Sequence, residues 1–490
     1  MSRTSTTSRE GGVAALALLL ALATGLLAHN HYALALIIPI GLAGSIVLLV
    51  RPVLGAFLLA GTIPLEAVLM LEGVTASKLI GIAVVGTWAA QKLFRRESLN
   101  ALLSPALIQV SILFLAFACL SLIWAEYPAG LGRNLFLLAQ LIVLCVVLCD
   151  LLSTWDRIIW VAKFVVLATS VAALMVAVQY FFGGARRAGG GVAGGINKTA
   201  SMLVTVLPLA FFLLRSRETP FWRWLGLAYI PLAGVGVAVT LSRMNYLLFP
   251  LVVAVHLVFM ARTNGDRGKV LALGFAIVVG VSFVPMDAIR DRAMTMVPYL
   301  TKTVGQDDPV EGVSARGFHL RASLAMFSDH PFGGLGYQTY PRHFLAYQAR
   351  LLPGGSGSRL YSSGQNPHNS HFSLLATLGI GGGLLWAGIF ATAVYYLIRS
   401  WRIVGRKGGI PFILVQSASV IVGIQFLNGF YDEIHRSKIF WLVMALTVAI
   451  YRIAKRDETY RPGPREAHLD IEPANSRFRP PQSVVGAGRP

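Results

Sequence analysis

Long blocks of apolar residues, separated by short polar or glycine-rich breaks, recur along most of the chain. A block of about 20 consecutive apolar residues is long enough to cross the hydrocarbon core of a bilayer as an α-helix. A transmembrane β-barrel would instead show short strands in which apolar and polar residues alternate. The pattern therefore predicts an all-α, polytopic integral membrane protein.

The apolar blocks predict about fourteen transmembrane spans when each sufficiently long block is counted once. Their approximate limits are 12–29, 32–50, 52–71, 77–93, 105–124, 134–152, 157–181, 199–214, 225–241, 245–261, 269–286, 372–398, 410–430 and 438–453. The early blocks are short and closely spaced, and two of them are also compatible with one re-entrant pair. A count of about twelve spans is therefore the alternative.

Basic residues in the breaks predict the side of each loop, because cytoplasmic loops of membrane proteins carry an excess of Lys and Arg. They recur on one predicted side at Lys92, Arg95, Arg96, Arg215, Arg217, Arg223, Arg262, Arg267, Lys269, Arg399, Arg402, Arg406, Lys407 and Arg452. We expect this side to be cytoplasmic, with both termini on it. The chain then divides into a cytoplasmic N-terminus (1–11), transmembrane helices (12–286), a large extracytoplasmic loop with helices (287–371), transmembrane helices (372–453) and a disordered cytoplasmic tail (454–490).

Composition agrees with the membrane class. The chain is 55% hydrophobic and only 13% charged, about half the charged fraction usual in a soluble protein. Its net charge of +20 is explained by cytoplasmic loops that contact anionic lipid. No nucleic-acid-binding motif accompanies the charge, so the lipid bilayer and not nucleic acid is the expected partner. Cys119, Cys145 and Cys149 lie inside apolar blocks, and they predict neither a disulfide framework nor a metal site.

The predicted extracytoplasmic loop is unusual in its chemistry. It holds His319, His330, His343, His368 and His371, which are half of the histidines of the chain, and seven arginines. Arginines on this side break the positive-inside rule, and such departures are expected at functional sites. The loop therefore holds the first candidate site residues.

Three short segments contain candidate chemistry. In "SRMN", Arg243 lies between two apolar blocks, where it either snorkels at a tight turn or binds an anion through its guanidinium. In 314–344, an amphipathic helix is expected to end at His330-Pro331. Arg316 is expected to precede this helix and Arg321 to lie in its second turn, and a solvated helix face also explains either arginine.

The third segment is "NPHNSHF", where a span is expected to begin near Ser370 with Asn369 or Ser370 as the N-cap. His368 then lies at the mouth of the span. It is either an interfacial residue that makes a cap hydrogen bond or a group that accepts a proton near neutral pH. His371 lies one turn further in and is expected to be structural. The carboxylates of Asp432 and Glu433 are weaker candidates on the same side.

These segments together resemble the O-antigen ligase and O-antigen polymerase superfamily of bacterial membrane glycan enzymes. "LSRMN", "ARGFHLRASLAMFSDHPFGGLGYQTY" and "PHNSHFSLLATLGIGGGLLW" resemble the motifs of that superfamily in order and spacing, and "GGINKTASMLVTVLPL" does so more weakly. The resemblance covers roughly 190–450. Leu320 stands where Trp is common, and Met244-Asn245 replaces the small residues that often follow Ser-Arg.

The resemblance implies a glycosyltransferase of the bacterial inner membrane whose active site faces the periplasm. It implies a metal-independent, inverting transfer without a cofactor, from a polyprenyl-diphosphate-linked glycan to a sugar hydroxyl on lipid A-core or on a growing glycan. Arg243 and Arg316 would bind the diphosphate, with Arg321 as a further candidate, and His368 would activate the acceptor. Other polysaccharide-assembly proteins are expected partners. Ligase and polymerase both remain open.

A flippase or transporter of lipid-linked glycan is the alternative function. Such a protein is expected to show internal repeats and charged residues at mid-membrane. In this chain the unusual polar residues gather at the predicted outer boundary, which favours the enzyme.

Overall fold

The computed structural model describes residues 51–71, 74–128, 130–184, 187–189, 191–216, 218–262, 313–351, 366–405 and 408–459. The predicted spans 12–29, 32–50 and 269–286 lie outside the described residues, as do the predicted N-terminal segment 1–11 and the tail from residue 460 onward.

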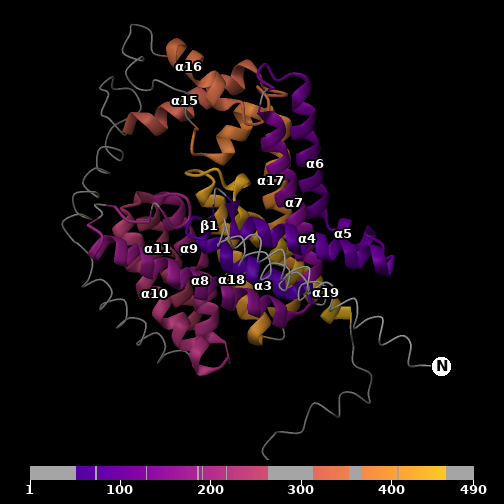
Figure 1. The fold of residues 1–490 in the computed structure, drawn as a ribbon, viewed down its shortest axis with the longest axis vertical. Helices are drawn as coiled ribbons and strands as arrows, with labels where there is room; N and C mark the ends of the chain where they lie inside the picture. Colours follow the sequence, from indigo (N-terminus) through magenta and orange to yellow (C-terminus); the bar gives the residue numbers. More distant parts are fainter. Residues whose placement is uncertain are drawn as a thin grey trace, which may run out of the picture.

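The described residues confirm an all-α polytopic membrane protein (Figure 1). Eight helices are long and apolar enough to cross a membrane: α6 with the 3-10 turn η2 (Ala106–Ile123), α7 (Leu131–Leu151), α8 (Trp155–Phe181), α9 (Ile196–Arg215), α10 (Pro220–Thr240), α11 (Arg243–Ala261), α17 (Ser370–Gly405) and α18 (Gly409–Asn428). The other described helices are α3 (Pro52–Thr62), α4 (Ala76–Arg95), α5 (Asn100–Leu103), α15 (Val313–Asp329), α16 (Tyr340–Leu351), α19 (Lys438–Thr459) and the 3-10 turns η1 (Ile63–Leu65) and η5 (Ile434–Arg436).

The predicted span 52–71 is wrong in its length. α3 ends at Thr62 after 11 residues, which rise about 17 Å, while the hydrocarbon core is about 30 Å thick. The chain continues through η1 into a two-residue antiparallel hairpin, β1 (Met70–Leu71) with β2 (Val74–Thr75). Pro64 supplies no backbone N–H to prolong the helix, and the Glu66 carboxylate forms an ion pair with Lys438.

Several hydroxyl side chains inside the spans donate to a carbonyl of their own helix. Ser111 donates to the carbonyl of Leu107 at 2.8 Å, and Thr169 donates to the carbonyl of Val165 at 2.6 Å. An unpaired polar group in hydrocarbon costs several kcal/mol, so this local bonding lets hydroxyl residues occur in otherwise apolar helices.

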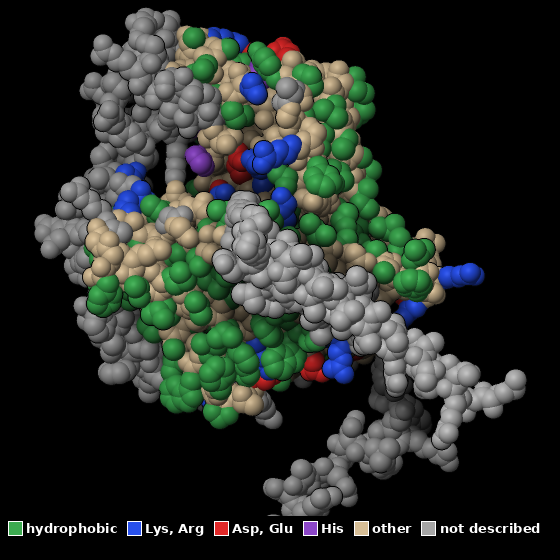
Figure 2. All heavy atoms as spheres, viewed as in Figure 1, with side chains coloured by type: hydrophobic (Ala, Val, Ile, Leu, Met, Phe, Trp, Pro, Cys, Tyr) green, Lys and Arg blue, Asp and Glu red, His purple; other side chains and the backbone are tan. Residues whose placement is uncertain are grey.

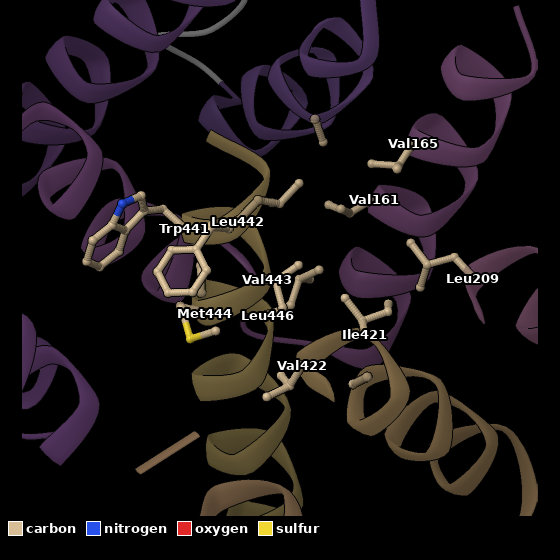
Figure 3. Packing of buried hydrophobic residues seen from close by; sticks show 14 of the residues in the cluster. Val161, Val165, Leu209, Ile421, Val422, Trp441, Leu442, Val443, Met444 and Leu446 are labelled. Atoms are coloured by element: carbon tan, nitrogen blue, oxygen red, sulfur yellow. The ribbon is translucent and has the colours of Figure 1, made fainter. Parts of the chain in front are cut away.

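The centre of the helix bundle is packed by α8, α9, α18 and α19 (Figure 3). Val161 and Val165 from α8 and Leu209 from α9 lie in the same cluster as Ile421 from α18 and Val443 from α19. All of these side chains are less than a tenth exposed. The core therefore joins early and late parts of the chain into one bundle.

α15 and α16 lie over one end of the bundle, above the start of α17 (Figure 1). α17 is interrupted at Gly379, whose φ of 60° and ψ of −161° are not helical. The glycine-rich turn that follows α15 lies against this interruption. The Ile380 N–H donates to the Pro331 carbonyl at 2.7 Å, and the Gly336 N–H donates to the Thr377 carbonyl at 2.8 Å. Backbone hydrogen bonds thus fasten the α15–α16 cap to α17.

Two glycines make this close approach possible. Gly334 has a φ of 65°, and a Cβ added there would lie 2.3 Å from the carbonyl carbon of Thr377. A Cβ added at Gly379 would lie 2.5 Å from the carbonyl oxygen of Phe332. At both positions a side chain is excluded for two reasons: φ is positive, and an added Cβ would overlap backbone atoms of the neighbouring segment.

We expect Gly334→Ala and Gly379→Ala each to destabilise the protein by about 3 kcal/mol or more, because both strain the backbone and separate the cap from α17. The melting temperature in detergent and the protease sensitivity of the cap measure the effect. Gly317→Ala is the matched control, since an added Cβ meets nothing within 4 Å in α15. A melting temperature as high for Gly334→Ala as for the control would contradict this explanation.

Candidate active site

The start of α17 faces a recess beneath the cap. Figure 2 shows histidine, Lys or Arg, and Asp or Glu side chains around a hollow between the α15–α16 end and the α9–α11 side of the bundle. His368, before α17, has electrostatic interactions with His319 from α15 and with Glu433 between α18 and η5. We call the space lined by these three side chains the recess.

His368 occupies the recess in a strained backbone conformation. Its φ is 47°, in the left-handed region that non-glycine residues rarely adopt, and its side chain is exposed. Pro367 before it is buried, and the Asn369 side chain after it caps α17 by accepting from the Phe372 N–H at 3.0 Å. The predicted start of the span at Ser370 and the Asn369 cap are therefore confirmed. Strain of this kind is typical of functional sites.

His319 enters the recess from the cap. Its Nδ1 lies 3.2 Å from the Tyr340 hydroxyl, and its ring stacks on Phe344 at 4.6 Å between centroids. Burial lowers the pKa of His319 to about 4, and the neighbouring imidazole of His368 acts in the same direction. The structure thus brings His319 to His368 and keeps it neutral at physiological pH.

Glu433 enters the recess from the opposite side. Burial raises the pKa of this carboxyl, while Arg436 and His368 oppose the rise. The Arg436 guanidinium donates to the Glu433 carboxylate at 3.1 Å and also to the Gln338 side chain at 3.1 Å. The carboxylate is therefore positioned beside His368 by a residue that also contacts the cap.

His435 lies behind the recess and links three segments. Its Nε2 is 2.8 Å from the Gln338 amide nitrogen and its Nδ1 is 3.1 Å from the Ser370 hydroxyl. The Ser370 hydroxyl in turn lies 2.9 Å from the carbonyl of Asp432, to which it donates. The ring is fully buried, and burial lowers its pKa to about 3. The amide N–H therefore donates to Nε2, and Nδ1–H donates to Ser370.

His371 does not reach the recess. The Trp386 indole donates to its Nδ1 at 3.0 Å, so its Nε2–H donates to the Phe426 carbonyl at 2.9 Å. Phe430 packs against the ring at 4.4 Å between centroids. Both ring nitrogens are engaged inside an aromatic cluster, which agrees with the expectation that this histidine is structural.

The three predicted diphosphate residues lie on two helices. Arg243 is the half-buried first residue of α11, whose Asn245 side chain donates to the Ser242 hydroxyl at 2.9 Å and approaches Ser201 of α9 at 3.4 Å. Arg316 lies in the first turn of α15, which begins at Val313, so the prediction that it precedes the helix is wrong.

Arg321 is exposed and lies about 140° around α15 from Arg316, on a different face. The structure thus separates the two arginines of α15. Among the described residues, no group of three or more His, Cys, Asp or Glu side chains is arranged to hold a metal ion.

The fold and the recess define a multi-pass membrane protein with a polar site at one end of its helix bundle. A model of the family described as O-antigen ligase matches residues 228–387, about a third of the chain. This stretch includes Arg243, Arg316, Arg321 and His368. The match supports the predicted resemblance to the O-antigen ligase and polymerase superfamily, and that family implies a glycosyltransferase-like ligase or polymerase activity in general. None of the curated proteins compared with the chain matches it.

Acid is expected to destabilise the capped end of the molecule. His319 and His435 have folded-state pKa values of about 4 and about 3, whereas an unfolded histidine has a pKa of about 6.5. Below pH 6.5 the unfolded chain binds more protons, so stability present at neutral pH is lost as the pH falls toward 4. Melting temperatures between pH 7 and 4.5 measure this loss.

The fall in melting temperature between pH 7 and 4.5 should be smaller for His435→Gln than for the wild type. At pH 7 this variant should melt at a lower temperature than the wild type. The exposed His330 offers a control as His330→Gln, which should retain the wild-type slope. Equal slopes in all three proteins would show that buried histidines do not cause the acid sensitivity.

Proposed function

We propose that the protein transfers a polyprenyl-diphosphate-linked glycan to a sugar hydroxyl at the outer face of the bacterial inner membrane, with its active site facing the periplasm and both termini in the cytoplasm. The observation that carries the proposal is His368, exposed and strained in a recess that α15, the start of α17 and the α18–η5 connection share. The O-antigen ligase match supports the general activity.

His368 acts as the general base. The acceptor hydroxyl oxygen attacks the anomeric carbon of the donor sugar, and its proton passes to the free nitrogen of the imidazole. The bond between the anomeric carbon and the diphosphate oxygen breaks as the new glycosidic bond forms. Attack from the side opposite the leaving group inverts the configuration at this carbon. Glu433 stabilises the imidazolium that results, since an opposite charge nearby favours the protonated form.

The arginines stabilise the leaving group in place of a metal ion. The polyprenyl diphosphate gains negative charge as it departs, and guanidinium groups bind phosphate oxygens through paired N–H donors. Arg243 begins α11 and Arg316 lies near the start of α15, and the N-terminal ends of helices favour anions. Arg321, on another face of α15, has a lesser role at the edge of the site.

The place of the recess suits two lipid-linked substrates. It lies at one end of a bundle of spans, so a prenyl chain extends into lipid while the sugars remain in water. The acceptor is either lipid A-core or a growing glycan, which makes the protein a ligase or a polymerase. Other polysaccharide-assembly proteins supply the donor and take up the product.

His368→Ala should reduce glycan transfer by about 10²-fold or more, the usual loss on removing a general base. The assay uses membranes supplied with lipid-linked donor and acceptor. His330→Ala removes an exposed histidine of the same cap and should leave the rate unchanged. Wild-type transfer by His368→Ala would exclude this histidine as the base.

Arg243→Lys and Arg316→Lys should each lower transfer by about 10-fold to 100-fold, because an ammonium lacks the paired donors of the guanidinium. Arg321→Lys should lose less. Arg342→Lys, an exposed position on α16, serves as the control in the same assay. Losses of equal size at all four positions would indicate a general charge effect and contradict specific diphosphate binding.

A further inference from the structure

A groove of about 710 Å³ lies between α17 and α18, in the part of the bundle away from the cap. Its walls are formed by Phe390, Ala391, Val394, Leu397, Ile398, Trp401, Arg402, Ser419, Val422, Gly423 and Phe426. Apart from Arg402 and Ser419 these side chains are apolar or aromatic. The volume is within the range of pockets that bind small molecules. Val394 and Ile398 are about half exposed, so the groove opens to the surroundings of the helix pair.

Aromatic contacts between the two helices close the groove at both ends. Phe390 of α17 packs edge-on against Phe426 of α18 at 5.4 Å between centroids, at the end nearer the recess. Trp401 packs edge-on against Phe412 at 5.0 Å at the other end. α17 and α18 therefore contact each other at both ends of the groove, and their side chains leave the space between these contacts unfilled.

The length of the groove matches one leaflet of a bilayer. Phe390 and Arg402 are twelve positions apart on α17, which corresponds to about 18 Å along the helix axis. Half of the hydrocarbon core is about 15 Å thick. A fatty acyl chain whose headgroup lies at the membrane surface fits this length.

The charge lies where a headgroup is expected. Arg402 is exposed at the end of the groove farthest from the recess, and Trp401 beside it is a residue type common at membrane interfaces. A guanidinium next to an apolar channel binds a phosphate while the attached chain fills the channel. A lipid with a net negative charge gains more from this arginine than a zwitterionic lipid, whose own cation offsets the charge of its phosphate.

We propose that the α17–α18 groove binds an anionic phospholipid, with an acyl chain along Val394, Ile398 and Val422 and the phosphate at Arg402. In the orientation proposed above, this lipid belongs to the cytoplasmic leaflet. The site is separate from the recess and does not depend on the transfer reaction. The lipid fills the space between two spans, one of which carries His368 at its outer end.

Gly423 allows a direct test, because a Cβ added there meets nothing within 4 Å. Gly423→Leu therefore extends a side chain from the wall of the groove, starting from a Cβ that meets no protein atom. Gly86→Leu in α4 is the matched control, since that glycine is equally open and lies away from the groove. The probe is phosphatidylglycerol added to each protein in mild detergent, with phosphatidylcholine as the neutral comparison, and retained lipid is detected by native mass spectrometry.

Wild type and Gly86→Leu should retain a phosphatidylglycerol molecule that Gly423→Leu lacks. Arg402→Gln, at an exposed position, should lower the preference for phosphatidylglycerol over phosphatidylcholine about fivefold. Equal retention by wild type and Gly423→Leu would overturn the proposal, as would an unchanged preference in Arg402→Gln. Retention of added polyprenyl phosphate in place of phosphatidylglycerol would also overturn it, by assigning the groove to the donor's chain.

Discussion

The contact on which the rest of the site depends is the docking of the glycine-rich turn after α15 against the interruption of α17 at Gly379. It is made by backbone atoms, with the Gly336 N–H bonded to the Thr377 carbonyl at 2.8 Å. Side chains cannot intervene, because the contact is too close for a Cβ at Gly334 or Gly379. This contact fixes the position of α15 relative to the start of α17. The positions of His319 and His368 relative to each other follow from it.

The histidines near the recess differ in burial. His319 and His435 are enclosed and neutral, and their ring nitrogens are occupied by Tyr340, Gln338 and Ser370. His368 remains exposed, and burial raises the pKa of the neighbouring Glu433 carboxyl. The enclosed histidines support the structure around an accessible one. A proton acceptor at a membrane surface needs such support, because its own loop would otherwise be free to move.

The sequence predicted what depends on local pattern. Continuous apolar blocks predicted the eight spans seen among the described residues, although the block at 52–71 forms only a short helix. The Asn369 cap and the end of α15 before His330-Pro331 are both confirmed. Tertiary contacts decided the rest. Leu320 and Leu324 of α15 are 38% and 44% exposed, because α15 packs against α16 through Phe318, Ala322 and Met326. Nothing in "YDEIHRSK" distinguished His435, whose role arises from contacts with residues about 65 and 97 positions away. The roles of the arginines stay predictions.

The claim that His368 accepts the proton is tested most directly by the transfer rate of His368→Gly with added imidazoles of graded basicity. Glycine adopts a φ of 47° without strain, so the backbone is preserved while the ring is removed. The account predicts a slow variant whose rate rises with the concentration and the basicity of the added imidazole. A variant that transfers glycan at the wild-type rate without imidazole would contradict it.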